Sequence, residues 1–474
     1  MKLYKLFFIP LFALCIGCND SKKQTLASEG ESEGKPEMSV DYSTELVMDA
    51  ITPNPGIKYK EVRKNDSSAP PVILNLEQKS EEKEIKLSEY YTSVKYVKLK
   101  HPYSNQGKAF LGNSNGRITY EQGSTSWRGL NSSVYLTPEY IIAGDAYFGY
   151  HCFDKEGNFI YTISVTNMLP EFDQRSNTLS FERDNSRKTI YSVFVLGDNC
   201  VIHSSQDGNT RLDFHNIPSK KTYLSRPSCG GRVMLINPET FVSLYYHLEA
   251  PVAYPFLHSF EMKGDTLCRF ISHNPVIENP NRKAFTNPDH GVSYYYNNTL
   301  TIRQAYNDTV YRMSAPNELT PAYILNFGKK KADLWTALYG DKSNILLPYH
   351  WLETEHFAFI IHSQNYDCPN NRNNNTIKFF YSYFDKKNNR LHSIPSTSYP
   401  EDFFLPNDME NGIPLLADNA YSDGKSLYIG HTKLQLENIL KHKTFSSLPS
   451  EQQDKVRSLH EDMEDGDLLV MILE

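Results

Sequence analysis

The nine residues Phe153–Tyr161, FDKEGNFIY, define a unit from which the rest of the fold can be inferred. An aromatic residue ends a first strand, a polar turn follows, and a second strand begins, which is the pattern of an antiparallel hairpin. The same order of residue types recurs in four further stretches, namely Phe214–Lys221, Phe260–Leu267, Tyr311–Glu318 and Phe384–Leu391. This repetition indicates one supersecondary unit that is used several times.

The spacing of these units predicts a β-propeller. Successive copies begin 46 to 73 residues apart, whereas four-stranded propeller blades recur about every 40–50 residues and longer intervals accommodate loop insertions. The average interval of about 58 residues gives six to seven blades between Ile85 and Glu474. Aromatic residues make up 13% of the chain, with 32 Tyr and 25 Phe, which favours strands over a helical bundle. We therefore predict an all-β fold.

The C-terminal region departs from the repeat. Lys433–His442 and Ser450–Met463 have the apolar spacing of helices, and Ser450 with Gln453 three residues later matches a capping box. The apolar run Leu468–Leu473 then predicts a final strand. Because an open ring leaves two sheet edges unpaired, we predict that this strand joins the sheet formed near Ile85–Leu99.

Residues 1–18 are typical of an export signal. Two lysines at positions 2 and 5 precede the apolar run Leu6–Ile16, which is too short to span a bilayer. The run ends at Gly17 and Cys18, which resembles the lipobox of bacterial lipoproteins, although Cys15 occupies the position where a Leu is usual. We predict a lipoprotein signal peptide with Cys18 as the acylated residue, which anchors the protein to the membrane through lipid. A plain secretory peptide is the alternative.

Residues 19–80 have the composition of a flexible tether between this anchor and a domain over residues 81–474. The stretch Ser28–Pro36 is polar and cannot build a core, although an apolar piece such as Val72–Leu74 could lie against the domain. No later segment contains 18 uninterrupted apolar residues, so we expect no membrane span. Five cysteines remain after Cys18 without a Cys-x-x-Cys pair, and we expect mostly buried free thiols.

The chain resembles the six-bladed β-propeller lipoproteins of Bacteroidota, a family largely of unknown function. The resemblance rests on four stretches, which are Ile85–Leu99, Tyr150–Ile163, Asn307–Gly328 and Gly466–Ile472. It implies a six-bladed β-propeller, and with the two helices expected above we predict a six-bladed β-propeller with a short helical insertion near the C-terminus. It also implies an outer-membrane location, facing either the periplasm or the cell surface, and it supplies no catalytic residue.

Charge and motifs exclude several functions. The formal net charge is −7, so the protein lacks the overall positive charge that attracts nucleic acid. The sequence contains no P-loop, dinucleotide fingerprint, metalloprotease helix or EF-hand loop, so we expect no cofactor and no metal. His350 and His356 are six residues apart, too distant for one ion on a single strand. Ser228–Gly231, SCGG, is the nearest approach to a reactive turn, and without an identified base we interpret it as a tight loop.

Three polar-aromatic clusters remain as candidate ligand-binding positions. Flat aromatic faces beside Asp and His suit sugars or peptides, although tyrosines between blades also serve packing. The candidate residues are Tyr245, Tyr246, His247, Asp289, His290, His350, Trp351 and Glu353.

These observations lead to three functional hypotheses. The first is a lipid-anchored envelope propeller that binds a glycan, peptide or protein partner without catalysis. The second is a glycan-active hydrolase or lyase with carboxylates at the propeller axis, since a glycosidase needs only two suitably spaced carboxyl groups. The third is a structural subunit of an outer-membrane uptake complex, which an exposed apolar patch on one face of the ring would indicate.

Overall fold

The computed structural model describes most of the chain from residue 70 onward, all of it within the compact unit Glu45–Glu474. The described residues are 70–102, 133–145, 149–164, 170–173, 178–181, 189–206, 209–228, 231–244, 255–263, 266–271, 291–332, 344–365, 377–396, 403–410, 412–416, 420–464 and 466–474.

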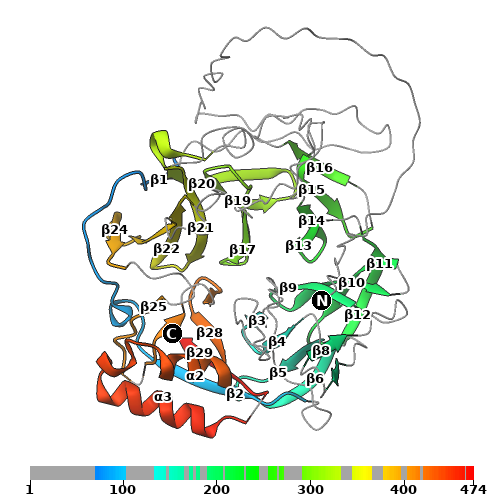
Figure 1. Cartoon of the computed structure of the whole chain (residues 1–474). Helices are drawn as coiled ribbons and strands as arrows, with labels where there is room; N and C mark the ends of the chain where they lie inside the picture. The colour runs from blue at the N-terminus through cyan, green and yellow to red at the C-terminus, as the bar shows by residue number, and fades with distance from the viewer. Residues whose placement is uncertain are drawn as a thin grey trace, which may run out of the picture. The chain divides into compact units, whose positions relative to one another are not determined.

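Six antiparallel sheets form the blades of a ring (Figure 1). Blade 1 contains β3 (Ser133–Leu136), β4 (Ile141–Asp145), β5 (Gly149–Phe153) and β6 (Phe159–Ser164). Blade 2 contains β9 (Thr189–Leu196), β10 (Asn199–Gln206), β11 (Asn209–Asn216) and β12 (Lys221–Pro227). Blade 3 contains β13 (Arg232–Asn237), β14 (Thr240–Leu244), β15 (Pro255–Glu261) and β16 (Thr266–Ile271).

The other three blades complete the ring. Blade 4 contains β17 (Val292–Tyr296), β18 (Thr299–Arg303), β19 (Thr309–Ala315) and β20 (Glu318–Asn326). Blade 5 contains β21 (Leu346–Glu353), β22 (Phe357–Gln364), β23 (Lys378–Asp385) and β24 (Arg390–Ile394). Blade 6 contains β27 (Tyr421–Ser422), β28 (Leu427–Thr432), β29 (Leu468–Leu473) and β2 (Val94–Leu99). The predicted six-bladed propeller is confirmed.

Smaller elements lie outside the four-stranded sheets, in the segments before and between the blades and, for η6, within the insertion of blade 6. They are β7 (Pro170–Asp173), β8 (Thr178–Phe181), β25 (Phe404–Leu405), β26 (Leu415–Leu416), η1 (Leu87–Glu89), η3 (Gly328–Lys330) and η6 (Phe445–Ser447).

The repeated unit corresponds to the same position in five of the six blades. All five stretches found in the sequence are the hairpins between the third and fourth strands of blades 1 to 5, beginning with the β5–β6 hairpin. In the first of them the Asp154 carboxylate accepts the backbone N–H groups of Glu156 and Asn158. This Asx-type bonding explains why the polar turn has a recognisable sequence.

The ring closes in blade 6, where strands from the two ends of the domain meet. β2 pairs antiparallel with β29, with Val94 opposite Leu473 and Leu99 opposite Leu468. Every residue of β29 is buried. The predicted pairing of the first and last strands is therefore confirmed.

Two helices form an insertion between β28 and β29. They are α2 (Lys433–Lys441) and α3 (Ser450–Asp462), close to the predicted ranges. The expected capping box at Ser450 is wrong, because the N-cap of α3 is Pro449 and Ser450 is already inside the helix. The capping box lies instead on α2, where Thr432 and Gln435 bond reciprocally.

The packed part of the chain begins before the predicted boundary at residue 81. Strand β1 (Val72–Asn75) pairs in parallel with β20 at the outer edge of blade 4, and the Leu74 side chain is 1% exposed. Further on, Glu82 forms a parallel bridge with Ser393 at the edge of blade 5. The apolar side chains at 72 and 74 favour this docking, which agrees with the expectation that Val72–Leu74 could lie against the domain. The signal peptide, Cys18 and the tether up to residue 69 lie outside the described residues.

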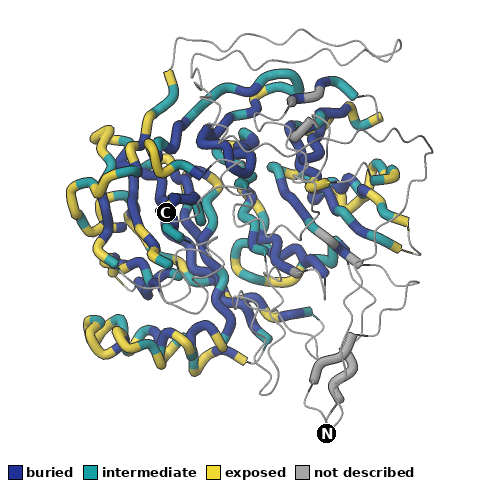
Figure 2. Tube along the Cα trace, turned by 45° about the horizontal axis from the view of Figure 1, so that its top comes forward, coloured by how far each residue is buried: buried dark blue, intermediate teal, exposed yellow. Residues whose placement is uncertain are grey.

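The core lies between neighbouring blades. Phe214 of blade 2 contacts Phe241 of blade 3 with ring centroids 5.2 Å apart, and Tyr323 of blade 4 contacts Trp351 of blade 5 at 5.0 Å. Figure 2 shows buried positions along the strands and exposed positions in the turns and on the C-terminal helices.

Two further expectations can be compared with the described residues. Cys152 and Cys200 are buried free thiols, as expected, and Cys268 is buried as well. No helix in these parts of the chain is long and apolar enough to cross a membrane.

Candidate functional site

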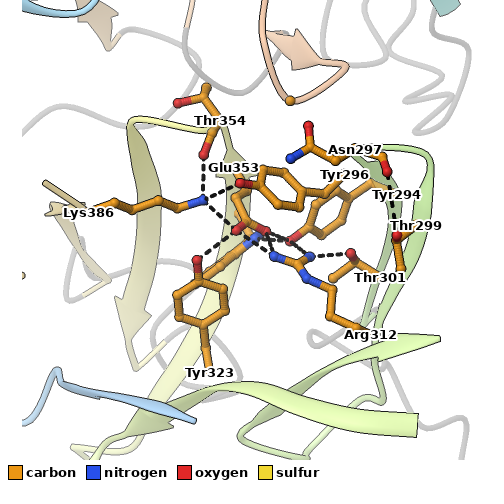
Figure 3. Close-up of polar contacts among 12 residues, drawn as sticks. Tyr294, Tyr296, Asn297, Thr299, Thr301, Arg312, Tyr323, Glu353, Thr354 and Lys386 are labelled. Carbon is orange, nitrogen blue, oxygen red and sulfur yellow. Dashed lines mark hydrogen bonds and ion pairs between the residues drawn. The ribbon is translucent and has the colours of Figure 1, made fainter. Parts of the chain in front are cut away.

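A charged and aromatic cluster joins blades 4 and 5, and we call it the Glu353 cluster (Figure 3). Blade 4 contributes side chains from β17, β19 and β20, and blade 5 contributes side chains from β21 and from the turn after β23. The members are Tyr294, Tyr296, Arg312, Tyr323, Trp351, Glu353 and Lys386.

The carboxylate of Glu353 is the centre of the cluster, and its side chain is 0% exposed. Arg312 Nη2 lies 2.6 and 2.7 Å from its two oxygens, and Lys386 Nζ lies 2.7 Å from Oε1. The hydroxyls of Tyr294 and Tyr323 donate to it at 2.5 and 2.6 Å. A buried carboxylate needs such donors, because an unpaired charge in this environment is costly.

Tyr296 lies against both cations. Its ring centroid is 4.4 Å from the Arg312 guanidinium carbon and 4.3 Å from Lys386 Nζ, both within the range of a cation–π interaction. Lys386 also donates to the Tyr296 hydroxyl at 3.2 Å and to the Thr354 carbonyl at 2.5 Å. The ring therefore fixes the positions of the two positive groups.

The charges of the cluster do not balance. Burial pushes the pKa of Glu353 upward, but the charges of Arg312 and Lys386 outweigh it and hold that pKa below the ordinary carboxyl value. Burial, followed by the charge of Glu353, raises the pKa of Tyr294 well above its ordinary value, and the same causes raise the pKa of Tyr323. The tyrosines are therefore neutral, and one carboxylate faces two cations.

The cluster lies at the end of the ring where turns from three blades meet. β17 ends at Tyr296, and the following turn brings Asn297 toward Gly424 in a turn of blade 6. A Cβ on Gly424, where φ is +106°, would come within 2.1 Å of Asn297 Oδ1. The N–H of Glu355, in a turn of blade 5, donates to the Gly424 carbonyl at 2.6 Å. This position therefore needs glycine so that the turns can approach closely.

The structure separates the predicted site residues. Trp351 and Glu353 belong to the cluster, and the Trp351 indole N–H donates to the Tyr294 hydroxyl at 2.6 Å. His350 lies on the same strand and is half-buried, but consecutive residues of a strand point to opposite faces. The five candidates Tyr245, Tyr246, His247, Asp289 and His290 lie outside the described residues, and their role stays a prediction.

Sequence reasoning missed Arg312, Tyr323 and Lys386. A charged residue within the apolar strand Thr309–Ala315 was the available signal for Arg312, since buried strands rarely carry an unpaired charge. Arg312 and Glu353 are 41 residues apart in the chain, so only the packing of two blades brings them together. Among the described residues, no group of three or more His, Cys, Asp or Glu side chains could hold a metal ion.

Comparison with known proteins places the chain in a family. No curated protein matches it. Among solved structures, it is similar to a candidate exported protein of Bacteroides fragilis NCTC 9343, with a TM-score of 0.48 and 11% identity over 85% of this chain and 98% of that one. It also resembles Kuenenia stuttgartiensis hydrazine synthase, with a TM-score of 0.32 and 11% identity over 74% and 89% of the two chains. BamB of Moraxella catarrhalis matches with a TM-score of 0.24 and 10% identity over 48% and 54%.

A family model covers most of the domain described above. It is the domain of unknown function DUF4933, and it matches residues 54–442. Because this match spans well over half of the sequence, the chain belongs to the DUF4933 family.

Proposed function

We propose that this protein is a lipid-anchored β-propeller of the outer membrane that binds a ligand without transforming it. We further propose that the ligand carries a carboxylate or another anionic group and binds beside the Glu353 cluster. The observation that carries this proposal is the excess cation in the cluster, where Arg312 and Lys386 face a single carboxylate.

A net charge held inside a protein is costly unless something offsets it. The side chains of Arg312 and Lys386 are each 17% exposed, whereas Glu353 is fully covered. The positive groups are therefore the part of the cluster that an outside ligand can approach. Perturbed and unbalanced charges of this kind gather at functional sites.

The neighbouring groups suit a polar ligand. Tyr296 offers an aromatic ring, and Asn297, in the turn after it, offers an amide. An acidic sugar would pair its carboxylate with the cations and place its ring against an aromatic face. The anchor and the outer-membrane location are supported by the signal sequence and Cys18.

The described residues favour neither alternative function. Glu353 is the single carboxylate of the cluster, whereas a glycosidase needs two facing ones. The exposed large apolar side chains of the described residues lie on elements of five different blades rather than on one; they are Ile73, Phe159, Tyr223, Phe380 and Leu434.

The test is a thermal-shift screen of purified full-length protein against acidic and neutral oligosaccharides of equal length, with acidic peptides as a second set. A ligand at 100 times its dissociation constant stabilises the folded state by about 2.7 kcal/mol. We expect an acidic ligand to raise the melting temperature and its neutral counterpart to leave it unchanged. The shift should weaken as ionic strength rises.

Two variants connect binding to the cluster. Lys386→Met removes the excess cation and should abolish the ligand-induced shift. Lys387→Met, at the exposed neighbouring position, changes the net charge equally and should preserve it. If acidic ligands stabilise both variants alike, or if none stabilises the wild type, the cluster serves only to join the blades.

A further inference from the structure

Ser228 and His203 form a hydroxyl–imidazole pair at the edge of blade 2. Ser228 follows the last strand of the blade, and His203 lies on its second strand, β10. The Ser228 Oγ is 3.0 Å from His203 Nε2. The Ser228 backbone N–H donates to the Thr210 carbonyl at 2.9 Å, which fixes the residue that carries the hydroxyl.

The pair lies where blade 2 meets blade 3. Arg226, two residues before Ser228, has its guanidinium carbon 5.1 Å from the Phe241 ring centroid of blade 3. Gly231 leads directly into the first strand of blade 3 with φ +70°, and a Cβ there would be 2.4 Å from the Leu244 carbonyl oxygen. Ser228 and Gly231 therefore lie on either side of the connection from blade 2 to blade 3, a position that the sequence indicated only as a loop.

This site is distinct from the Glu353 cluster. The first strands of blades 4 and 5 end in the cluster, at Tyr296 and Glu353. Ser228 instead lies next to the beginning of the first strand of blade 3, at Arg232. Because successive blades repeat the same antiparallel strand order, their first strands run in the same direction and the two sites occupy opposite ends of the blades.

The imidazole is suited to accept a proton. Burial lowers the pKa of His203 below its ordinary value, so the ring is neutral at neutral pH. A neutral imidazole with Nε2 at hydrogen-bond distance from a hydroxyl is the arrangement that activates a serine nucleophile.

We propose that Ser228 and His203 act as a nucleophile and base that hydrolyse a carboxylic ester. Ser228 Oγ bonds to the ester carbonyl carbon while its proton moves to His203 Nε2. The bond to the alcohol oxygen then breaks, and the alcohol leaves with that proton. Water attacks the acyl-serine, gives its proton to His203, and releases the carboxylic acid as the proton returns to Ser228. We choose an ester as the substrate class because an alcohol is an easier leaving group than an amine, so a site of only two residues can hydrolyse an ester more readily than an amide.

The experiment is to label full-length protein with a fluorophosphonate and to locate the adduct by peptide mass spectrometry. We expect one adduct, on Ser228, and hydrolysis of p-nitrophenyl acetate that the label abolishes. Ser228→Ala should remove both. His203→Gln keeps a polar side chain but cannot take the proton, and it should slow labelling at least 100-fold.

Two controls separate chemistry from structure. Ser225→Ala removes an exposed hydroxyl on the same blade that donates to Asp213, and Thr222→Ala removes a hydroxyl 3.4 Å from His215 Nδ1. Both should label at the wild-type rate. An adduct on another residue, no adduct on folded wild-type protein, or equal labelling of Ser228 in His203→Gln would overturn the proposal. Because the site lies apart from the Glu353 cluster, these outcomes leave the ligand-binding test unaffected.

Discussion

At the scale of the residue, the carboxylate of Glu353 connects blades 4 and 5, which are built from separate segments of the chain. It accepts hydrogen bonds from Arg312, Tyr294 and Tyr323 of blade 4 and from Lys386 of its own blade. Removing one partner of such a group leaves the other charges buried and unpaired, which costs more than the pair itself contributes.

We therefore predict that Glu353→Gln lowers the free energy of unfolding by about 3–5 kcal/mol. Glu355→Gln is the matched control, because the Glu355 side chain is 44% exposed and its replacement should change stability by no more than about 0.5 kcal/mol. Urea unfolding followed by tyrosine and tryptophan fluorescence measures both. Similar small effects of the two substitutions would show that the cluster does not stabilise the blade contact.

A second residue, His431, makes stability depend on pH. It lies on β28 and is 1% exposed, and burial lowers its pKa to about 4. The unfolded chain binds a proton at this position below about pH 6.5, whereas the folded chain does so only near pH 4. Stability is therefore complete above pH 6.5 and is lost as the pH falls from there toward 4.

Replacing His431 with Leu should reduce the loss of stability between pH 7 and pH 5 by about 2 kcal/mol. Urea midpoints at the two pH values give this difference. His460→Gln, at a half-buried position on α3, provides a comparison for the loss of a histidine elsewhere in the domain. A His431→Leu protein with the full wild-type pH dependence would contradict the assignment.

At the scale of the element, local sequence decided most of what forms. The hairpins between the third and fourth strands follow from turn residues and from the alternation of apolar and polar side chains, and both helices follow from apolar spacing. These signals act over only a few residues. The helix cap shows the limit of such reasoning. Thr432–Gln435 and Ser450–Gln453 are equivalent patterns, but Pro449 occupies the cap position of α3 and leaves Ser450 within the helix.

The two patterns give a matched pair of substitutions. Thr432→Ala removes the cap of α2 and should lower the free energy of unfolding by about 1 kcal/mol. Ser450→Ala removes a hydroxyl that makes no cap bond and should change it by no more than about 0.5 kcal/mol. Chemical denaturation compares them directly, and a larger effect at Ser450 would mean that α3 is capped by serine after all.

At the scale of the whole molecule, ring closure depends on β29. This strand lies between β2 and β28, and the Glu474 carbonyl beyond it accepts the N–H groups of Thr92 and Ser93. Without β29, the two strands on either side of it lose their pairing and the apolar interior of blade 6 becomes exposed.

Deletion of residues 468–474 should therefore abolish the cooperative unfolding transition and produce aggregates, as seen by circular dichroism during heating and by size-exclusion chromatography. Deletion of Glu474 alone keeps all six residues of β29 and should preserve a folded domain that elutes like the wild type but has a lower melting temperature. A truncated chain that lacks β29 and melts like the wild type would show that the ring does not need this closure.

The sequence by itself determined the propeller, its hairpins, the helical insertion and the strand that closes the ring. These features depend on turn chemistry, apolar alternation and the need to pair sheet edges, all of which can be read locally or from the two ends of the chain. Only the tertiary structure brought Arg312 to Glu353 and His203 to Ser228. Their contacts depend on how blades and distant strands pack around the ring. This geometry results from the packing of many side chains that are far apart in the sequence, so no short stretch of sequence predicts it.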